Sequence, residues 1–304
     1  MQSRLSINCE IRKAALEVFM TEPYSWIDGE WISGNPPIIG PLTNAAWMAT
    51  VVFDGARAYD GLAPDLDLHA ERCIASALAL GLEPQVTAKE IQRLAVDGLS
   101  HFPSGAAVYI RPMFYGDEGW LIPTTTKFCL TLFELPMNSP DKGLSICRTT
   151  RVRPTPLAAP TDAKAACLYP NAHRMLKEAI SRGFDAAVVG DANGNVAELT
   201  TSNIFLVKDD VVSTPVPNGT FLNGITRQRT IKLLLEAGIK VEERTIDFSE
   251  LDTADELFST GNANKIQPIS RYEHCSFQPG PIALKAQRLY RTYAEAHGKL
   301  VNFC

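Results

Sequence analysis

Apolar residues recur at helical spacing in several stretches of the chain. Between residues 68 and 82 they return every three or four positions, and Gly81 stands near the end, where glycine often terminates a helix. Thr87 and Glu90 have the spacing of a capping box at the start of a second such stretch. Helices are therefore expected over residues 68–82, 87–99, 170–182, 225–237 and 281–297. A further helix is expected over residues 11–19, with packing on the rest of the chain as its simplest role.

Shorter apolar runs, bounded by turn residues, predict strands in both halves of the chain. Residues 26–32 alternate around an Asp-Gly pair, which is a hairpin signal. In residues 106–115 the alternation places Tyr109 and Arg111 on one face, and Pro112 predicts a sheet edge or a bulge. Strands are also expected over residues 128–133, 144–150, 186–189, 203–207, 211–213 and 241–245. Short strands in series favour an antiparallel sheet or barrel in the second half, rather than a Rossmann fold.

The chain divides into two parts at a segment rich in proline and polar residues. Residues 136–143 (PMNSPDKG) have the composition of a linker, and 304 residues are enough for about two domains. We expect a smaller α+β domain over residues 1–135 and a larger domain over residues 144–304. The fold class is therefore α/β in the broad sense, of the α+β type.

Composition and charge exclude several classes of function. The chain is 45% hydrophobic and 21% charged, its net charge is −5, and it has no basic block that would indicate binding to nucleic acid or a membrane. No apolar run approaches the roughly 20 residues of a membrane span, and the first residues lack the apolar core of a signal peptide. Seven scattered cysteines without CxxC pairs indicate reduced thiols in the cytoplasm and no metal site. One of them, Cys167, is expected to be a small buried packing residue.

Lys164 is the first candidate for chemistry. It follows Pro160 and precedes the apolar run 165–168. An amine that loses solvation at such an edge is expected to have a lowered pKa, which a lysine that forms a Schiff base requires. The alternative is an ordinary surface cation. Tyr169 lies five positions later and is expected to reach the same cavity.

Glu198 is the second candidate. It follows a predicted hairpin turn and lies among the apolar or small residues Val196, Ala197 and Leu199. A carboxylate in such surroundings needs a cationic partner, and the protonated ring nitrogen of pyridoxal phosphate is one such group. The alternative is an ordinary charged residue after a turn.

Two further stretches are suited to phosphate, and one to a carboxylate. Arg72 lies in the first turns of a predicted helix, and its guanidinium can bind phosphate in a bidentate manner. Residues 224–227 (GITR) open another helix, where backbone N–H groups and the Thr226 hydroxyl can bind phosphate. Tyr109 and Arg111 project together and can bind a carboxylate. Each has a plain structural alternative: a solvated arginine, a threonine at a helix start, and a half-exposed strand face.

Taken together, these stretches resemble the fold-type IV pyridoxal-phosphate enzymes, and in particular the branched-chain amino acid aminotransferases. The matching stretches are residues 52–59 (VFDGARAY), 68–72 (LHAER), 109–112 (YIRP), 161–169 (TDAKAACLY), 193–205 and 224–227 (GITR). They follow the order and the approximate spacing of the family over residues 25–275. Each is weak alone, and the set is specific.

The resemblance implies a two-domain homodimer whose larger domain is a pseudo-barrel that binds pyridoxal 5'-phosphate. It implies that Lys164 binds the cofactor covalently and moves the substrate proton, while Glu198 pairs with the ring nitrogen. The other implied cofactor contacts are Arg72, Tyr169, Leu222, Ile225, Thr226 and Asn262, with Arg72, Ile225, Thr226 and Asn262 at the phosphate. The implied substrate pocket comprises Phe53, Tyr109, Arg111 and Ala263, and no metal is implied.

Two departures from the family pattern leave the substrate open. Asn262 stands where the branched-chain family usually has a threonine, and residues 199–203 (LTTSN) are similar to the corresponding run of D-amino-acid and (R)-amine transaminases. We expect transamination between a branched-chain-like amino acid and a 2-oxo acid such as 2-oxoglutarate or pyruvate. The alternatives are an (R)-amine or D-amino-acid transaminase and a lyase similar to aminodeoxychorismate lyase. A ligand-binding protein without catalysis is disfavoured, because Lys164, Tyr169 and Glu198 are all present.

Overall fold

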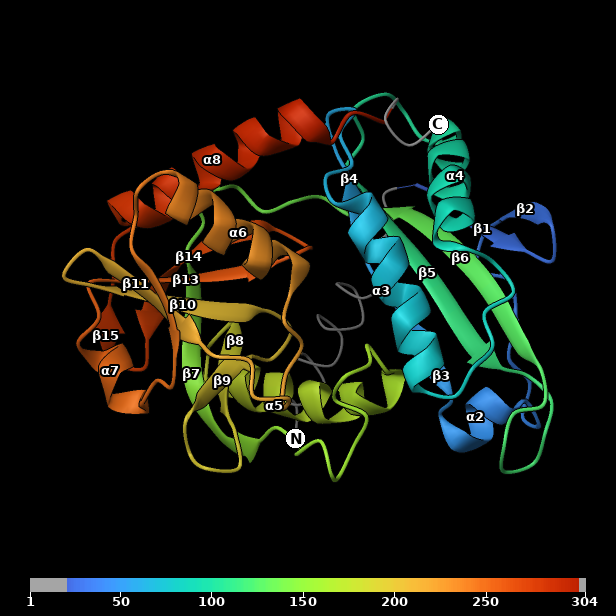
Figure 1. Ribbon diagram of the computed structural model, residues 1–304, viewed down its shortest axis with the longest axis horizontal. Helices are drawn as coiled ribbons and strands as arrows, with labels where there is room; N and C mark the ends of the chain where they lie inside the picture. Colours follow the sequence, from blue (N-terminus) through green and yellow to red (C-terminus); the bar gives the residue numbers. More distant parts are fainter. Residues whose placement is uncertain (1–20, 301–304) are drawn as a thin grey trace, which may run out of the picture.

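The computed structural model describes residues 21–300 and arranges them around two β-sheets that lie side by side (Figure 1). One sheet is built from the first half of the chain and the other from the second half. This agrees with the expected two-part, mixed α/β organisation. The helix predicted over residues 11–19 lies outside the described residues.

The first sheet has the strand order β2-β1-β6-β5-β3, and β4 also pairs with β5. Its strands are β1 (Tyr24–Ile27), β2 (Glu30–Ser33), β3 (Val51–Phe53), β4 (Ala56–Ala58), β5 (Val108–Gly116) and β6 (Thr126–Glu134). The helices of this half are α2 (Asn44–Met48), α3 (Leu66–Ala79), α4 (Ala88–Gly98) and the 3-10 turn η1 (Leu99–His101). The predicted hairpin is confirmed by the antiparallel pairing of β1 with β2. Leu66 of α3 and Leu94 of α4 pack on Ile110 and Leu130, so both helices cover one face of the sheet.

Pro112 lies in the interior of the sheet, so the prediction that its strand forms an edge is wrong. Strand β5 pairs with β6 on one side along its whole length. On its other side it pairs with β3 and then with β4, and the ladder is interrupted between them at residues 54–55. The Pro112 carbonyl accepts a hydrogen bond from the Asp54 N–H at 3.0 Å. Asp54 and Pro112 oppose each other in this register, and Pro112 has no N–H to donate the second ladder bond, which accounts for the interruption.

The second sheet has the order β12-β11-β10-β13-β14-β7-β8-β9, with β15 added to β14. Its strands are β7 (Leu144–Val152), β8 (Ala186–Gly190), β9 (Val196–Leu199), β10 (Asn203–Lys208), β11 (Val211–Pro215), β12 (Val241–Arg244), β13 (Glu256–Gly261), β14 (Lys265–Tyr272) and β15 (Cys275–Ser276). Its helices are η2 (Ala166–Leu168), α5 (Tyr169–Ser181), α6 (Ile225–Glu236), α7 (Phe248–Asp252) and α8 (Pro281–His297).

The second sheet is mixed, which corrects the expectation of a purely antiparallel one. The pairs β7–β8, β11–β12 and β14–β7 are parallel. Helix α5 lies between β7 and β8 in the chain, and α6 lies between β11 and β12, so each helix forms a crossover connection. The lengths of the strands do not reveal such crossovers. Two strands run parallel when the connection between them returns the chain to the same edge of the sheet.

The two halves are joined by more than one segment of chain. Residues 136–143 contain no helix or strand and connect β6 with β7. After α8 the chain returns to the first half, where the Ala63 N–H donates to the Gly298 carbonyl at 2.6 Å and Leu62 forms a bridge with Lys299. The domain boundary at residues 136–143 stays a prediction.

Three further properties of residues 21–300 concern membrane insertion, thiols and metal ions. None of the helices in this span is both long and apolar enough to cross a membrane. Its five cysteines are free, and Cys167 is exposed, so the expected packing role of Cys167 is wrong. Within the same span no group of three histidine, cysteine, aspartate or glutamate side chains is placed to hold a metal ion.

Asp65 forms a buried polar contact between the two halves. It directly precedes α3 and is 3% exposed. Its Oδ1 accepts hydrogen bonds from Arg229 of α6 (Nη2, 2.6 Å) and from Tyr293 of α8 (2.9 Å), and its Oδ2 accepts one from Tyr290 (3.2 Å). A buried carboxylate with this set of donors is a strong contact, and removing its charge leaves Arg229 without a counter-ion.

We therefore expect Asp65→Asn to lower the free energy of unfolding by about 3 kcal/mol, measured by urea denaturation. Asparagine tolerates the positive φ of 59° at this position, so the loss reports the charge and not the backbone. Asp60→Asn is the matched control, because Asp60 also has a positive φ but forms an exposed ion pair with Arg291, at 2.7 Å. Its loss should stay below about 1 kcal/mol. Equal losses would show that Asp65 does not hold the two halves together.

Candidate active site

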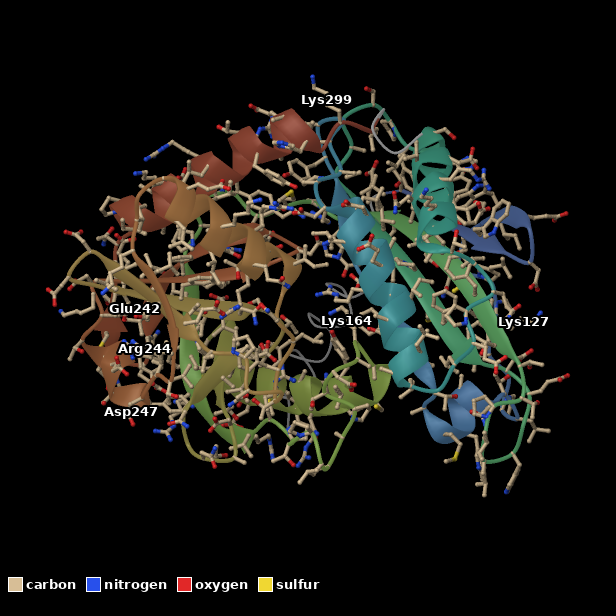
Figure 2. All side chains as sticks on the ribbon, viewed as in Figure 1. Lys127, Lys164, Glu242, Arg244, Asp247 and Lys299 are labelled. Atoms are coloured by element: carbon tan, nitrogen blue, oxygen red, sulfur yellow. The ribbon has the colours of Figure 1, made fainter. Side chains whose placement is uncertain are left out.

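A cavity with a volume of about 300 Å³ lies where the two halves meet. Its wall comes from α3, β3 and β5 of the first half, and from β9, the start of α6, the β13–β14 turn and residues 153–172 of the second half. Eleven of the twelve residues predicted for the site line it: Phe53, Arg72, Tyr109, Lys164, Tyr169, Glu198, Leu222, Ile225, Thr226, Asn262 and Ala263. Figure 2 shows Lys164 near the middle of the molecule, between the two halves.

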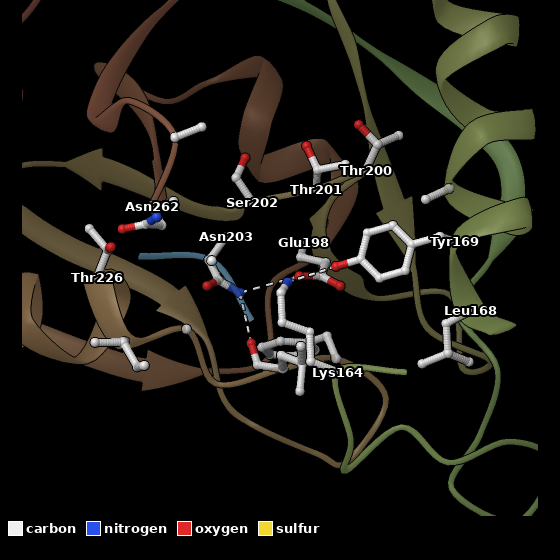
Figure 3. Close-up of a pocket in the computed structure, with 18 of the residues that line it drawn as sticks. Lys164, Leu168, Tyr169, Glu198, Thr200, Thr201, Ser202, Asn203, Thr226 and Asn262 are labelled. Atoms are coloured by element: carbon white, nitrogen blue, oxygen red, sulfur yellow. Dashed lines mark hydrogen bonds between the residues drawn. The ribbon is translucent and has the colours of Figure 1, made fainter. Parts of the chain in front are cut away.

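Lys164 is bound through its backbone by the first half of the chain and through its side chain by Tyr169 of the second half. Its N–H donates to the Ser76 hydroxyl of α3 at 3.0 Å, and its carbonyl accepts from the Phe53 N–H of β3 at 3.1 Å. Its Nζ donates to the Tyr169 hydroxyl at 2.7 Å, and Figure 3 shows these two side chains pointing toward one another. The backbone contacts fix the Cα of Lys164, and the Tyr169 hydroxyl fixes its Nζ.

The pKa of Lys164 is raised, which corrects the expectation that it is lowered. Burial does lower this pKa, as the sequence suggested, but the nearby Tyr169 and Asp54 outweigh burial and favour the charged amine. Asp54 could not be placed next to Lys164 from the sequence, because the two lie more than one hundred positions apart.

Glu198 is buried at the end of β9 and has the cationic partner that its surroundings require. The partner is Arg153, whose Nη2 lies 2.6 Å from Oε1 of Glu198. Asn203 donates from Nδ2 to the other carboxylate oxygen at 3.3 Å. Burial raises the pKa of Glu198 to about 7, although Arg153 and Lys164 act against this rise. Arg153 was missed because it lies in a proline-rich loop without a motif.

Arg72 points toward the cavity from α3 and is oriented by a buried carboxylate. Its Nε donates to Oδ2 of Asp54 at 2.7 Å, and its Nη2 donates to Oδ1 at 2.9 Å. Nδ1 of His69 lies 2.6 Å from the same Oδ1. Burial alone would raise the pKa of Asp54, but Arg72 and His69 hold it well below its usual range. His69 lines the cavity and Asp54 supports it from behind; both lie in matching stretches, 68–72 and 52–59, but neither was among the predicted site residues.

The start of α6 forms the opposite part of the wall. The first turn of a helix has N–H groups without partners in the helix, and Gly224, Ile225 and Thr226 present this turn to the cavity. A Cβ at Gly224 would overlap Oδ1 of Asn203, so only glycine fits there. Asn203 also donates to the Leu222 carbonyl at 3.1 Å and thereby connects this turn with Glu198.

Tyr109 and Arg111 point to the same face of β5 but have different environments. Tyr109 lines the cavity, and its hydroxyl lies so close to Gly55 that a Cβ there would overlap it. Arg111 is exposed and does not line the cavity, and its guanidinium lies 4.7 Å from the ring centre of Phe53, which does. Of the predicted site residues, Arg111 is therefore the one that the structure places beside the cavity rather than in its wall.

Arg57, the cross-strand neighbour of Tyr109, is fully buried. Its guanidinium lies 6.0 Å from the centre of the Tyr109 ring, and none of its three nitrogens has a hydrogen-bond partner in the part of the chain that the structure describes. Burial lowers the pKa of Arg57 to about 10. Arg57 lies in the matching stretch 52–59 but was not among the predicted site residues.

Comparisons with known proteins agree on one family. The sequence model of the family described as Amino-transferase class IV matches residues 51–272. A probable branched-chain-amino-acid aminotransferase of Rickettsia typhi is 34% identical over 252 residues, covering 81% of this chain and 86% of that protein. The branched-chain-amino-acid aminotransferase of Pseudomonas aeruginosa is 32% identical over 280 residues, covering 87% of this chain and 91% of that protein.

The solved structures that resemble this fold lead to the same group of proteins. An aminotransferase from Brucella abortus bound to the cofactor PLP superimposes with a TM-score of 0.88 at 46% identity, covering 90% of this chain and 100% of that one. The branched-chain amino acid aminotransferase of Escherichia coli superimposes with a TM-score of 0.84 at 27% identity, covering 90% and 95%.

The raised pKa of Glu198 predicts how stability changes with pH. An unfolded glutamate releases its proton near pH 4.5, whereas Glu198 in the folded protein keeps it until about pH 7. Between these values the folded state binds more protons, so this group lowers the free energy of unfolding as pH rises, by about 3 kcal/mol in total. Unfolding of the dialysed protein at several pH values measures this term, and Glu198→Gln should lack it. Glu236→Gln, on an exposed position of α6, is the control and should keep the wild-type profile. Identical profiles for Glu198→Gln and wild type would contradict the assignment.

Proposed function

The chain belongs to the class IV aminotransferases, and we propose that it moves an amino group between a branched-chain-like amino acid and a 2-oxo acid. It is a transaminase that uses pyridoxal phosphate, similar to branched-chain amino acid aminotransferases. Our proposal concerns the substrates, with 2-oxoglutarate or pyruvate as the acceptor. The observation that carries the proposed chemistry is the contact of Lys164 with Tyr169 in the cavity that also contains Glu198.

The residues of the cavity fit the two ends of pyridoxal phosphate. One side has the N–H groups of Ile225 and Thr226 and the buried Asn262 Nδ2, which has no hydrogen-bond partner among residues 21–300. These groups, with Arg72, are suited to phosphate oxygens. The buried Glu198 carboxyl is suited to a protonated ring nitrogen. We propose that Leu222 packs on the ring and that the Tyr169 hydroxyl donates to its phenolic oxygen.

Lys164 is the residue that we propose to carry the reaction. When bound, pyridoxal phosphate supplies an electron-withdrawing ring that stabilises negative charge on the substrate Cα. The Lys164 amine would hold the cofactor covalently between turnovers, and when free it would take the proton from the substrate Cα. Its raised pKa must fall for this step, and the loss of water when substrate fills the cavity favours the neutral amine. Tyr169, 2.7 Å away, keeps the amine in position.

Glu198 and Arg153 set the charge at the ring nitrogen. A pKa of about 7 places Glu198 close to the change between its two forms at neutral pH. A cationic ring nitrogen would favour the carboxylate, and Arg153, at 2.6 Å, already favours it. The carboxylate would then hold a proton on the ring nitrogen, which would make the ring more electron-withdrawing.

The substrate pocket is proposed to comprise Phe53, Tyr109, Arg111 and Ala263. Phe53 lies between the Arg111 guanidinium, at 4.7 Å, and the Tyr169 ring, at 4.8 Å between centres. We propose that Arg111 reaches the substrate carboxylate from the solvent side of Phe53, while Tyr109 and the backbone near Ala263 contact it from the wall. Arg111 is exposed, so it keeps the freedom to turn toward a ligand.

An (R)-amine or D-amino-acid transaminase is the second candidate. The observation that favours it is that Thr200, Thr201 and Ser202 line the cavity, as does Asn262 in the turn where branched-chain enzymes usually have threonine (Figure 3). Exchange of the pockets for the carboxylate and the large group would invert the preferred substrate without moving Lys164. A lyase reaction differs from both because it needs no 2-oxo acid.

We also propose that the protein is a cytoplasmic homodimer. Trp47, Trp120 and Ile122 are 53%, 66% and 78% exposed, and the two indole rings lie 4.8 Å apart. Together with Met48 and Leu121 they form an apolar surface of α2 and the β5–β6 connection, which a second copy of the chain would cover. The free thiols of the described cysteines support a reducing compartment.

Reduction of the enzyme with borohydride should fix the cofactor on Lys164, because reduction converts a reversible link to the amine into a permanent one. Peptide mapping by mass spectrometry locates the label. Lys164→Ala should lose the visible absorption band of the bound cofactor and all measurable transamination. Lys127→Ala, an exposed lysine that is 42% accessible, should keep both. A label on another lysine would refute the assignment.

Replacement of Arg111 by alanine tests the carboxylate pocket. If Arg111 binds the substrate carboxylate, Arg111→Ala should raise KM at least tenfold for the 2-oxo acid and for amino acids, the scale of a lost charged hydrogen bond of about 1.5–3 kcal/mol. KM for a neutral aryl amine should change little. A panel with both enantiomers of each donor separates the two transaminase candidates from each other. Assays with and without a 2-oxo acid separate both from a lyase. Equal effects on charged and neutral donors would mean that Arg111 only supports Phe53.

A further inference from the structure

The turn between β13 and β14 ends at a lysine, the first residue of β14, that is buried without an ion-pair partner among the described residues. Lys265 is 6% exposed, and its φ of 58° lies in the left-handed region that lysine rarely adopts. Its Nζ lies 5.7 Å from the centre of the Tyr290 ring. None of the ion pairs among residues 21–300 includes Lys265. A buried ammonium in this position is costly, so its contacts are expected to serve a purpose.

The one hydrogen bond that Lys265 Nζ makes with another described side chain goes to Oδ1 of Asn262, at 2.5 Å. An ammonium group can donate hydrogen bonds but cannot accept them. The amide of Asn262 must therefore turn its oxygen toward Lys265, and its NH₂ group points the opposite way. The lysine thus determines which end of the amide is available for another contact.

The available end of this amide is the NH₂ group at the cavity. Asn262 lines the cavity, and its Nδ2 is buried with no hydrogen-bond partner in the described chain. A buried N–H group without an acceptor is destabilising, and a ligand oxygen would remove this cost. The arrangement is that of a donor held ready for an acceptor in the cavity.

We propose that Lys265 is a positioning residue that holds the Asn262 amide so that its Nδ2 donates to a phosphate oxygen of the cofactor. The proposal rests on the proposed assignment of Ile225 and Thr226 to that phosphate. Figure 3 draws Asn262 and Thr226 toward one side of the cavity, and Tyr169 and Leu168 toward the other. The amide therefore belongs to the side where the α6 N-terminus provides the other anion-binding groups.

Charge in this region also favours an anion. The neighbouring Arg57 is buried without a hydrogen-bond partner among the described residues, and the nearby Asp65 carboxylate is already bound by Arg229. Burial, and then Arg57, lowers the pKa of Lys265 to about 7, while Asp65 acts in the opposite direction. A bound phosphate would raise this pKa and so favour the ammonium form that orients Asn262. Ligand and lysine then stabilise one another.

The proposal is tested by the affinity of the full-length chain, freed of cofactor, for pyridoxal phosphate and for pyridoxal, which lacks the phosphate. Absorbance titration gives both dissociation constants. Lys265→Met keeps the apolar stem but removes the donor, and it should weaken binding of pyridoxal phosphate about tenfold while leaving pyridoxal within twofold. In an Asn262→Ala background the same Lys265→Met change should add no further loss. Lys232→Met, at a lysine that is 63% exposed on α6, is the control and should bind as wild type does.

Two further variants keep the test independent of folding defects in Lys265→Met. Asn262→Asp has the same shape and keeps an acceptor for Lys265, but it replaces the NH₂ group with oxygen, so it should weaken pyridoxal phosphate selectively. Asn262→Thr has a hydroxyl that rotates freely, so combining it with Lys265→Met should restore affinity to within about twofold of wild type.

Three results would overturn the proposal. Equal losses from Lys265→Met in the wild-type background and in the Asn262→Ala background would mean that the lysine only supports the turn. Unchanged affinity for pyridoxal phosphate, with a raised KM for amino-acid donors, would mean that the amide binds the substrate carboxylate. Wild-type affinity in Asn262→Asp would exclude the Nδ2 donor. Failure of the proposed function itself is a different result, because borohydride would then not label Lys164 in the wild-type enzyme.

Discussion

The position of Lys164 depends on a contact between parts of the chain that are far apart in sequence. The lysine follows an irregular loop of the second half, which could not by itself hold a reactive amine in one place. Its N–H is bound by Ser76 of α3, its carbonyl is bound by the Phe53 N–H of β3, and the next residue, Ala165, forms a bridge with Val52. The first half of the chain thus acts as the support on which the lysine is mounted. Because reacting atoms must be held to within a fraction of an ångström, this docking of the two halves is a condition for the chemistry that we propose for Lys164.

The second feature of the site is that its buried charges are neutralised or oriented by specific neighbours. Asp54 is bound by Arg72 and His69, and Glu198 is bound by Arg153. In a region with little water these contacts decide the protonation of each group, because burial and ion pairing act in opposite directions on the pKa. The result differs from one group to the next: the pKa of Asp54 is lowered and that of Glu198 is raised. Asp54 therefore stays ionised behind the cavity wall, where it orients Arg72, whereas Glu198 lies in the wall itself and has a carboxyl group that can respond to a ligand.

In the site that we propose, the turn between β13 and β14 replaces a threonine of the family pattern by asparagine at a phosphate contact. Threonine, the usual residue there in branched-chain enzymes, has a hydroxyl that needs no orienting partner. Asn262 has a donor and an acceptor at fixed positions, so a neighbour must select which one faces the cavity. The hydrogen bond from Lys265, the first residue of β14, makes that selection. The two residues are best regarded as one unit whose function neither has alone.

The sequence by itself determined most local elements and the family, and it predicted a set of site residues of which eleven line one cavity. The hairpin at β1–β2, the main helices and eleven of the twelve proposed site residues were recognisable, because periodicity, turn residues and motifs are properties of neighbouring positions. The tertiary structure alone decided the parallel pairs of the second sheet, the interior position of Pro112 and the place of Arg111 beside the cavity. It also decided that the pKa of Lys164 rises, and it identified Arg153 as the partner of Glu198. These outcomes depend on groups brought together from distant positions, and the electrostatic effect of a neighbour depends on its distance in space, which the order of residues does not specify.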